Sequence, residues 1–142
     1  MATKTINGAY PGGFVLGDVY SGLTLTASAS VGGTGVYVAG TASVLNEGSI
    51  AAGDARSDAG VYFREGGQVT NAFGGHITGY DGVASTVTRP VVVNIFNDGA
   101  ITGSHAGVSV SAGTVVNGGL PDTGARIQGY KGVILGAGTV LN

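Results

Sequence analysis

Eight carboxylates are the first candidates for chemistry in this chain, because paired acids cleave glycosidic bonds by general acid/base catalysis. Cleavage needs two acids held over one bond, and no two here form an Asp-x-Asp or Asp-Asp pair. Asp54 and Asp58 flank Arg56 in a segment that we expect to be a solvated loop. We therefore predict no catalytic residues and no enzymatic activity. The carboxylates are Asp18, Glu47, Asp54, Asp58, Glu65, Asp81, Asp98 and Asp122.

The residue pattern favours neither a metal site nor a phosphate site. His76 and His105 lie near predicted turns without evident carboxylate partners, and the chain contains no cysteine. The stretch GGTGVY at 32–37 lacks the aspartate of a calcium-binding repeat and the Lys-Ser/Thr pair of a phosphate-binding loop. We predict no metal and no cofactor.

The charge balance excludes nucleic acid as a partner. Six Lys and Arg residues are scattered through 142 residues and the net charge is -2, whereas phosphate recognition needs a clustered basic face. No apolar run reaches the roughly 18 residues of a membrane span, so we expect no membrane insertion by this chain. Residues 1–13, MATKTINGAYPGG, also lack the apolar run of a signal peptide.

Glycine accounts for 29 of the 142 residues, and its spacing reveals a repeat. A Gly-Val pair recurs at intervals of 25, 22, 25 and 25 residues. The asparagine of a Val-x-Asn signature follows each of these glycines by ten to twelve residues, and an Ile-containing element comes next. The Gly-Val pairs begin at Gly35, Gly60, Gly82, Gly107 and Gly132.

The three recurring elements are predicted to be short strands. Each has three to five residues, is rich in Val, Ile, Tyr and Thr, and is bounded by Gly, Asn or Asp. Three such strands per repeat fit one coil of a parallel β-helix, where each strand pairs with its equivalents in adjacent coils. We predict an all-β, single-domain β-solenoid of about six coils of 22–27 residues, without helix. Residues 1–34 are expected to form an atypical capping coil and residues 35–142 the repeats.

Stacked coils place equivalent residues in columns, so the repeated apolar positions are expected to line the interior. The first column contains Val36, Val61, Val83, Val108 and Val133. The second contains Val44, Val69, Val92, Val115 and Val140, and the third contains Ile50, Ile77, Ile101 and Ile127. The asparagines predicted to form a structural hydrogen-bonded ladder are Asn46, Asn71, Asn94, Asn117 and Asn142.

The sequence varies between each Ile element and the next Gly-Val pair, and solenoid geometry places these variable segments above one another. Aromatic and polar side chains in such a position are suited to contacts with glycans or proteins. The alternative interpretation, that they are tolerated turn residues, stays open. The possible ligand-contact column consists of Arg56, Tyr80, His105 and Tyr130. Residues 120–123 are expected to form a protruding loop.

Four stretches resemble the repeats of bacterial autotransporter passenger domains and related large surface adhesins: GVYV…SVLNEGSIAAG, GVYF…QVTNAFGGHITG, VVVNIFNDGAITG and TVVNGGLPDTGARIQG. The opening segment through GVYV is similar to the N-terminal start of such passengers, so the resemblance covers nearly the whole chain. It implies a right-handed parallel β-helix displayed outside a bacterial cell. The family's export signal and C-terminal membrane barrel are missing from these residues, which are then expected to be a fragment, an engineered chain or a short relative with another use.

Two functions from different classes remain. The first is a non-enzymatic structural and adhesive solenoid, extracellular or on the bacterial surface in its parent protein, whose partners are host or surface glycans or proteins. The alternative is a self-assembling subunit that stacks head-to-tail into filaments. Unpaired backbone groups at the open end of a stack are a template for another chain, and head-to-tail contacts generate open filaments.

Overall fold

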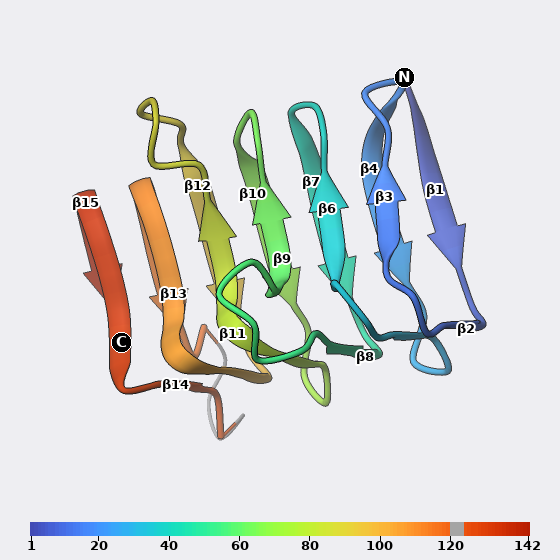
Figure 1. The fold of residues 1–142 in the computed structure, drawn as a ribbon. Helices are drawn as coiled ribbons and strands as arrows, with labels where there is room; N and C mark the ends of the chain where they lie inside the picture. The colour runs from blue at the N-terminus through green and yellow to red at the C-terminus, as the bar shows by residue number, and fades with distance from the viewer. Residues whose placement is uncertain (120–123) are drawn as a thin grey trace.

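The chain forms an all-β parallel solenoid. The computed structural model describes residues 1–119 and 124–142, so the loop predicted at 120–123 lies outside the described residues. Within the described ranges no helix occurs and all strand pairing is parallel. Figure 1 shows the strands side by side along the stack, with β1 at the N-terminal end and β15 at the C-terminal end. The predicted fold class is confirmed.

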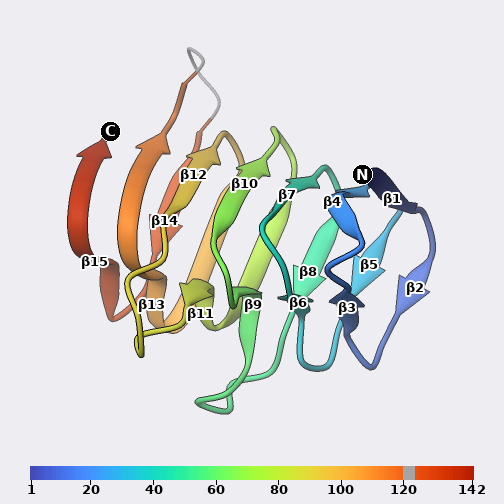
Figure 2. The same cartoon turned by 90° about the horizontal axis from the view of Figure 1, so that it is seen from above.

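The described strands pair in three columns that run along the stack (Figure 2). The first column contains β1 (Ala2–Ile6), β4 (Tyr20–Leu25), β7 (Ala42–Asn46), β10 (Gly67–Asn71), β12 (Val93–Asn97) and the ends of β13 (Ala100–Asn117) and β15 (Lys131–Leu141). The second contains β2 (Ala9–Tyr10), β5 (Ser30–Val31), β8 (Ser49–Ala51), the starts of β11 (His76–Ser85) and β13, and β14 (Arg126–Gln128). The third contains β3 (Phe14–Leu16), β6 (Val36–Val38), β9 (Ala59–Phe63), the end of β11, the middle of β13 and the start of β15.

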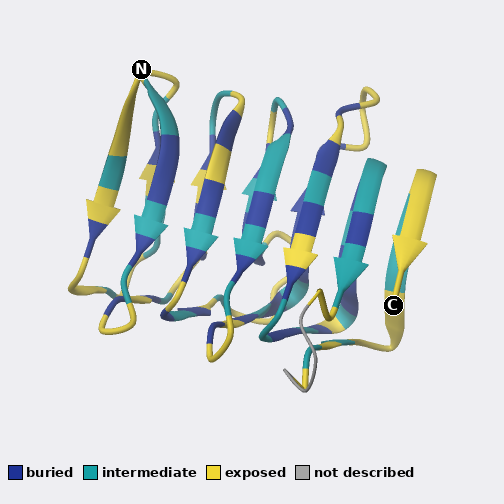
Figure 3. Cartoon of the chain, turned by 180° about the vertical axis from the view of Figure 1, so that it is seen from behind, coloured by how far each residue is buried: buried dark blue, intermediate teal, exposed yellow. Residues whose placement is uncertain are grey.

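The core forms because alternate residues of each strand point inward. In β6, Val36 and Val38 are fully buried, whereas Tyr37 between them is exposed. The same alternation in β7 buries Val44 and leaves Ser43 in solvent. Figure 3 shows these buried positions recurring from strand to strand through the middle of the stack. Each coil therefore contributes only a few apolar side chains and depends on its neighbours to cover them.

Two of the predicted interior columns are confirmed by the strand register. The valines of the Gly-Val pairs follow one another in the order Val36, Val61, Val83, Val108 and Val133. The isoleucines follow in the order Ile50, Ile77, Ile101 and Ile127.

The prediction for the remaining column is wrong at one coil. Ile95, not Val92, lies between Val69 and Val115, so the intervals are 26 and 20 residues instead of 23 and 23. Val92 is 58% exposed and lies outside the named strands. The physical reason is that the chain runs over the surface between the end of β11 and the start of β12 at Val93. The inward position of this column is therefore reached at Ile95, later in the sequence than Val92.

Candidate functional site

The asparagine ladder lies inside the solenoid. Each Nδ2 donates to Oδ1 of the asparagine in the next coil, at 2.8, 2.8, 2.8 and 2.7 Å along the series. The members are Asn46, Asn71, Asn97, Asn117 and Asn142. Asn46 and Asn71 are fully buried and Asn97 is 1% exposed, so their amides satisfy one another and the neighbouring backbone. The ladder is a structural device of the interior.

Asn94 is not a member of the ladder, and Asn97 takes its place. Asn94 is half-buried, and its Oδ1 accepts a hydrogen bond from the Thr114 backbone N–H at 3.0 Å. Asn46 and Asn97 are each followed two residues later by a glycine, whose N–H donates to the asparagine Oδ1. Asn94 has Phe96 at that position, but Asn71 belongs to the ladder with Phe73 there, so the glycine alone does not identify a ladder residue.

Of the predicted ligand-contact column, the structure brings Tyr80 and His105 together. Their rings are nearly parallel at 8° with centroids 5.0 Å apart, and His105 Nδ1 lies 2.9 Å from Asp81 Oδ1. Arg56 is exposed in the segment between β8 and β9. Tyr130 is 88% exposed, and its ring makes no ring contact with the other described residues. Tyr80 and His105 therefore form a local cluster rather than part of a continuous column.

A histidine hydrogen-bonded to a carboxylate also occurs in hydrolytic triads, so the surroundings of the Asp81–His105 pair bear on chemistry. Within residues 1–119 and 124–142, no serine or threonine hydroxyl hydrogen-bonds to His105, and Tyr80 covers one face of the ring. The same ranges contain no group of three His, Cys, Asp or Glu side chains placed to hold a metal ion. This geometry fixes the imidazole without presenting a nucleophile to it.

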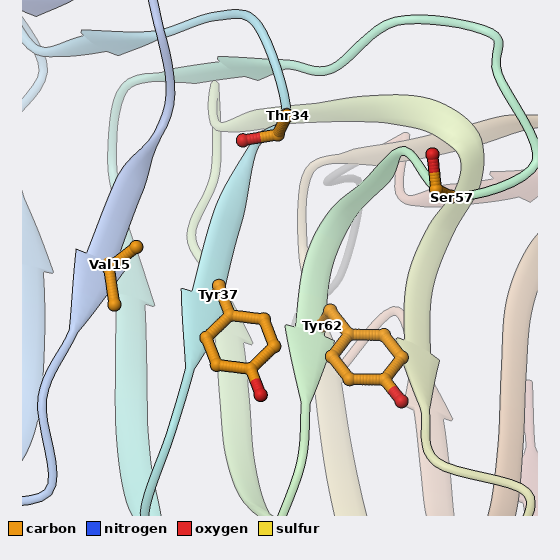
Figure 4. A pocket seen from close by; sticks show the side chains of 5 residues that line it. All are labelled: Val15, Thr34, Tyr37, Ser57 and Tyr62. Atoms are coloured by element: carbon orange, nitrogen blue, oxygen red, sulfur yellow. The ribbon is translucent and has the colours of Figure 1, made fainter.

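A second aromatic pair lies on the outer face of the third column. Tyr37 of β6 and Tyr62 of β9 are in register, and their rings have centroids 5.6 Å apart with 12° between their planes. Val15 of β3 is in register with Tyr37 and is 68% exposed. Figure 4 shows the two rings side by side on neighbouring strands, with their hydroxyls pointing the same way. We call Val15, Tyr37 and Tyr62 the tyrosine platform.

The tyrosine platform forms the floor of an open hollow of about 580 Å³. Thr34, from the turn before β6, and Ser57, from the segment between β8 and β9, complete its lining (Figure 4). Gly33 and Gly35 flank Thr34 with φ of 57° and 75°, a left-handed backbone that favours glycine and fixes this turn. None of the lining side chains is charged.

The platform was missed in the sequence, although its signal was present. Tyr37 and Tyr62 each follow the valine of a Gly-Val pair, so they occupy the same outward position one coil apart. An aromatic residue that recurs at a solvent-facing position has no packing role in the core, and this is what distinguishes it from the repeated apolar residues.

An exposed ion cluster joins the loop after β11 to the loop after β9. Arg89 forms a salt bridge with Glu65, and Arg64 Nε lies 3.5 Å from the other carboxylate oxygen of Glu65. The hydrogen bond from Arg89, with the charges of both arginines, holds the pKa of Glu65 below its usual value, and Glu65 raises the pKa of Arg89. The cluster is exposed to solvent and links loops of adjacent coils.

Comparison with known proteins adds no relative. No protein-family model, curated protein or solved structure matches the chain. In the described part of the chain, no helix has the length and apolar character required to cross a membrane. The parallel β-solenoid fold and the geometry of its outer face are therefore the basis for a functional conclusion.

Proposed function

We propose that the chain is a non-enzymatic, structural and adhesive β-solenoid, and that it is a segment of a bacterial surface-displayed or secreted protein of the autotransporter-passenger type. The repeat pattern and the parallel solenoid support this proposal. The observation that carries it is the difference between the residues at the inward and the outward positions of the strands. Inward positions hold the core columns and the asparagine ladder, while outward positions hold aromatic and hydroxyl groups.

A rigid interior favours a display function because it holds outward side chains in fixed rows. Every buried side-chain nitrogen or oxygen among the described residues has a hydrogen-bond partner. Neighbouring strands lie about 4.8 Å apart, so residues in equivalent positions present a regular array to a partner. Such preorganisation lowers the entropy cost of binding.

Binding and turnover assays on the same materials test the proposal. Fluorescent particles coated with the chain are expected to be retained on at least one member of a panel of immobilised glycans and extracellular matrix proteins. The soluble chain is expected to release no reducing ends and no unsaturated products from the same polysaccharides. Release above a buffer control would overturn the non-enzymatic part, and retention no greater than that of uncoated particles would overturn the adhesive part.

Self-assembly is a second candidate, favoured by the contrast between the two ends of the described stack. At the N-terminal end Ile6 and Leu16 are only 1% exposed, whereas at the C-terminal end the inward Val140 is 48% exposed. Figure 3 shows the exposed strand at the C-terminal end. A following coil would bury Val140 and pair with the free edge of β15. A second copy of the chain is one source of such a coil.

The asparagine ladder weakens this second candidate. Ile6 is in register with Leu25, and Leu25 is in register with Asn46, so the ladder position is apolar in the first coils. A second copy that continued the register would place Ile6 against Asn142 and leave the Asn142 amide without its ladder partner. Self-assembly predicts unbranched fibres of constant width in electron micrographs, and Val140→Lys would abolish them. Monodisperse monomers at high concentration would eliminate this candidate.

A further inference from the structure

We propose that the tyrosine platform binds the pyranose rings of a neutral, linear glycan that lies along the solenoid axis. This inference deepens the adhesive function proposed above and rests on it. The platform consists of Val15, Tyr37 and Tyr62, which occupy equivalent outward positions in three adjacent coils. It shares no residue with the predicted ligand-contact column, although Ser57 in the lining of the hollow is the chain neighbour of Arg56.

The fold itself does not need the two tyrosines where they are. Val36, Val38 and Val61 supply the inward packing of the same strands and are fully buried. Tyr37 is 38% exposed, and the hydroxyls of Tyr37 and Tyr62 make no hydrogen bond with another described residue. Aromatic side chains with a free polar end and few rotatable bonds are typical of recognition surfaces, because they supply contact area at low entropy cost.

The chemistry of the hollow selects a neutral polyhydroxylated ligand. Its floor is aromatic and aliphatic, which suits the C–H face of a pyranose. Hydroxyls lie around that floor: Thr34 Oγ1 has no hydrogen-bond partner among the described residues, and Ser57 Oγ is 3.3 Å from Asp58 Oδ1. The lining carries no charged side chain that would balance a carboxylate or phosphate. A sugar can satisfy these hydroxyls and cover the rings at once.

The spacing of the rings favours a glycan over a peptide. The ring centroids are 5.6 Å apart, close to the length that one pyranose adds to an extended glycan chain. A proline-rich peptide, the usual peptide ligand of aromatic grooves, repeats only about every 9 Å along its axis. The strands that carry the two tyrosines, β6 and β9, pair on both sides, so they offer a peptide no free edge for strand addition.

The platform has defined limits along the stack. Ala84 is in register with Tyr62 and is 7% exposed, so the aromatic surface ends at that coil. In the other direction Val15 provides aliphatic surface beside Tyr37. The site is therefore expected to prefer an oligosaccharide of several units over a monosaccharide.

Saturation-transfer NMR on the intact chain tests the site. The probes are cellohexaose, mannohexaose and maltohexaose, with hexagalacturonate as the charged comparator and deca-proline as the peptide comparator. We expect at least one neutral hexamer to receive saturation from tyrosine protons, and hexagalacturonate and deca-proline to receive none. Tyr37→Ala and Tyr62→Ala are each expected to weaken binding about tenfold, since one aromatic contact contributes about that factor.

Matched variants separate the site from the fold and from the proposed function. Phe73→Ala removes a ring that is 71% exposed in the turn after β10, in the first column of strands, and it is expected to leave binding unchanged. Equal binding by the double variant Tyr37→Ala/Tyr62→Ala, with a circular dichroism spectrum that shows it folded, overturns the site but leaves the adhesive function standing. Deca-proline binding that is lost on Tyr37→Ala makes the platform a peptide site. Absence of saturation transfer to every neutral hexamer also overturns the proposal.

Discussion

The asparagine ladder and the tyrosine platform are two products of the same repeat with opposite roles. Asn46 and Asn71 lie one coil apart inside the solenoid, and Tyr37 and Tyr62 lie one coil apart outside it. Each amide Nδ2 of the buried pair reaches three oxygen acceptors, whereas the tyrosine hydroxyls bond to no described residue. The comparison shows that repetition alone does not indicate a role. Burial and hydrogen bonding decide whether a repeated residue stabilises the stack or faces a partner.

Removal of one asparagine side chain from the ladder is expected to have the largest effect on the free energy of unfolding. Asn71→Ala removes one buried hydrogen bond from each of four groups: the Nδ2 of Asn46, the Oδ1 of Asn97 and two backbone carbonyls. Since a hydrogen bond contributes about 1 kcal/mol, we expect the free energy of unfolding to fall by about 4 kcal/mol. Urea denaturation followed by far-UV circular dichroism measures it. Thr70→Ala, an outward change in the same strand, is the control and should cost less than about 0.5 kcal/mol.

The corrected register gives a sharper test of the ladder. Asn97→Ala is expected to cost about 2 kcal/mol more than Asn94→Ala, because Asn97 is buried in the ladder and Asn94 makes one bond on the half-exposed face. The two substituted residues are three positions apart in β12, and both substitutions remove the same side-chain atoms. Equal losses in urea denaturation would contradict the register of β12.

Much of the fold could be predicted because the inward residues repeat with little variation. The glycines before Val36 and Val61 and the isoleucines at Ile50 and Ile77 each recur at nearly one coil length, and the strand register follows them. The failure at Val92 has a physical cause: residues 92–94 match the Val-x-Asn pattern, whereas the segment that takes the place in the strand column, Ile95-Phe96-Asn97, has isoleucine instead of valine.

The candidate site was harder to predict because its residues come from segments that the repeat does not relate. Tyr37 and Tyr62 repeat, but Thr34 lies in a turn and Ser57 in an enlarged connection between strands. Sequence spacing cannot show that Ser57 returns over the face formed by β3, β6 and β9. Tyr80 and His105 were predicted to lie in one column because both residues follow an Ile-x-Gly element. The contact between their rings was not predicted.

The platform is expected to contribute little to stability. Tyr62→Ala removes a half-buried ring and its contact with Tyr37, and an aromatic pair contributes about 1 kcal/mol. The free energy of unfolding should fall by that amount, well below the loss for Asn71→Ala, and Tyr130→Ala should leave it unchanged. Differential scanning calorimetry of the three variants checks the order. A loss for Tyr62→Ala equal to that for Asn71→Ala would make the platform a structural element.

The exposed ion cluster gives the smallest expected effect, and its pH dependence has a defined sign. Arg89 holds the pKa of Glu65 below its usual value of 4.5, so the pair stabilises the fold above that pH and loses its contribution as the pH falls through the lowered pKa. The pair is solvent-exposed, and salt screens it. Glu65→Gln should therefore lower the urea midpoint slightly at neutral pH and low salt. The difference should disappear both in strong salt and in acid well below pH 4.5. A difference that grew in acid would require Glu65 to stabilise the fold in its protonated form, which the contact with Arg89 does not allow.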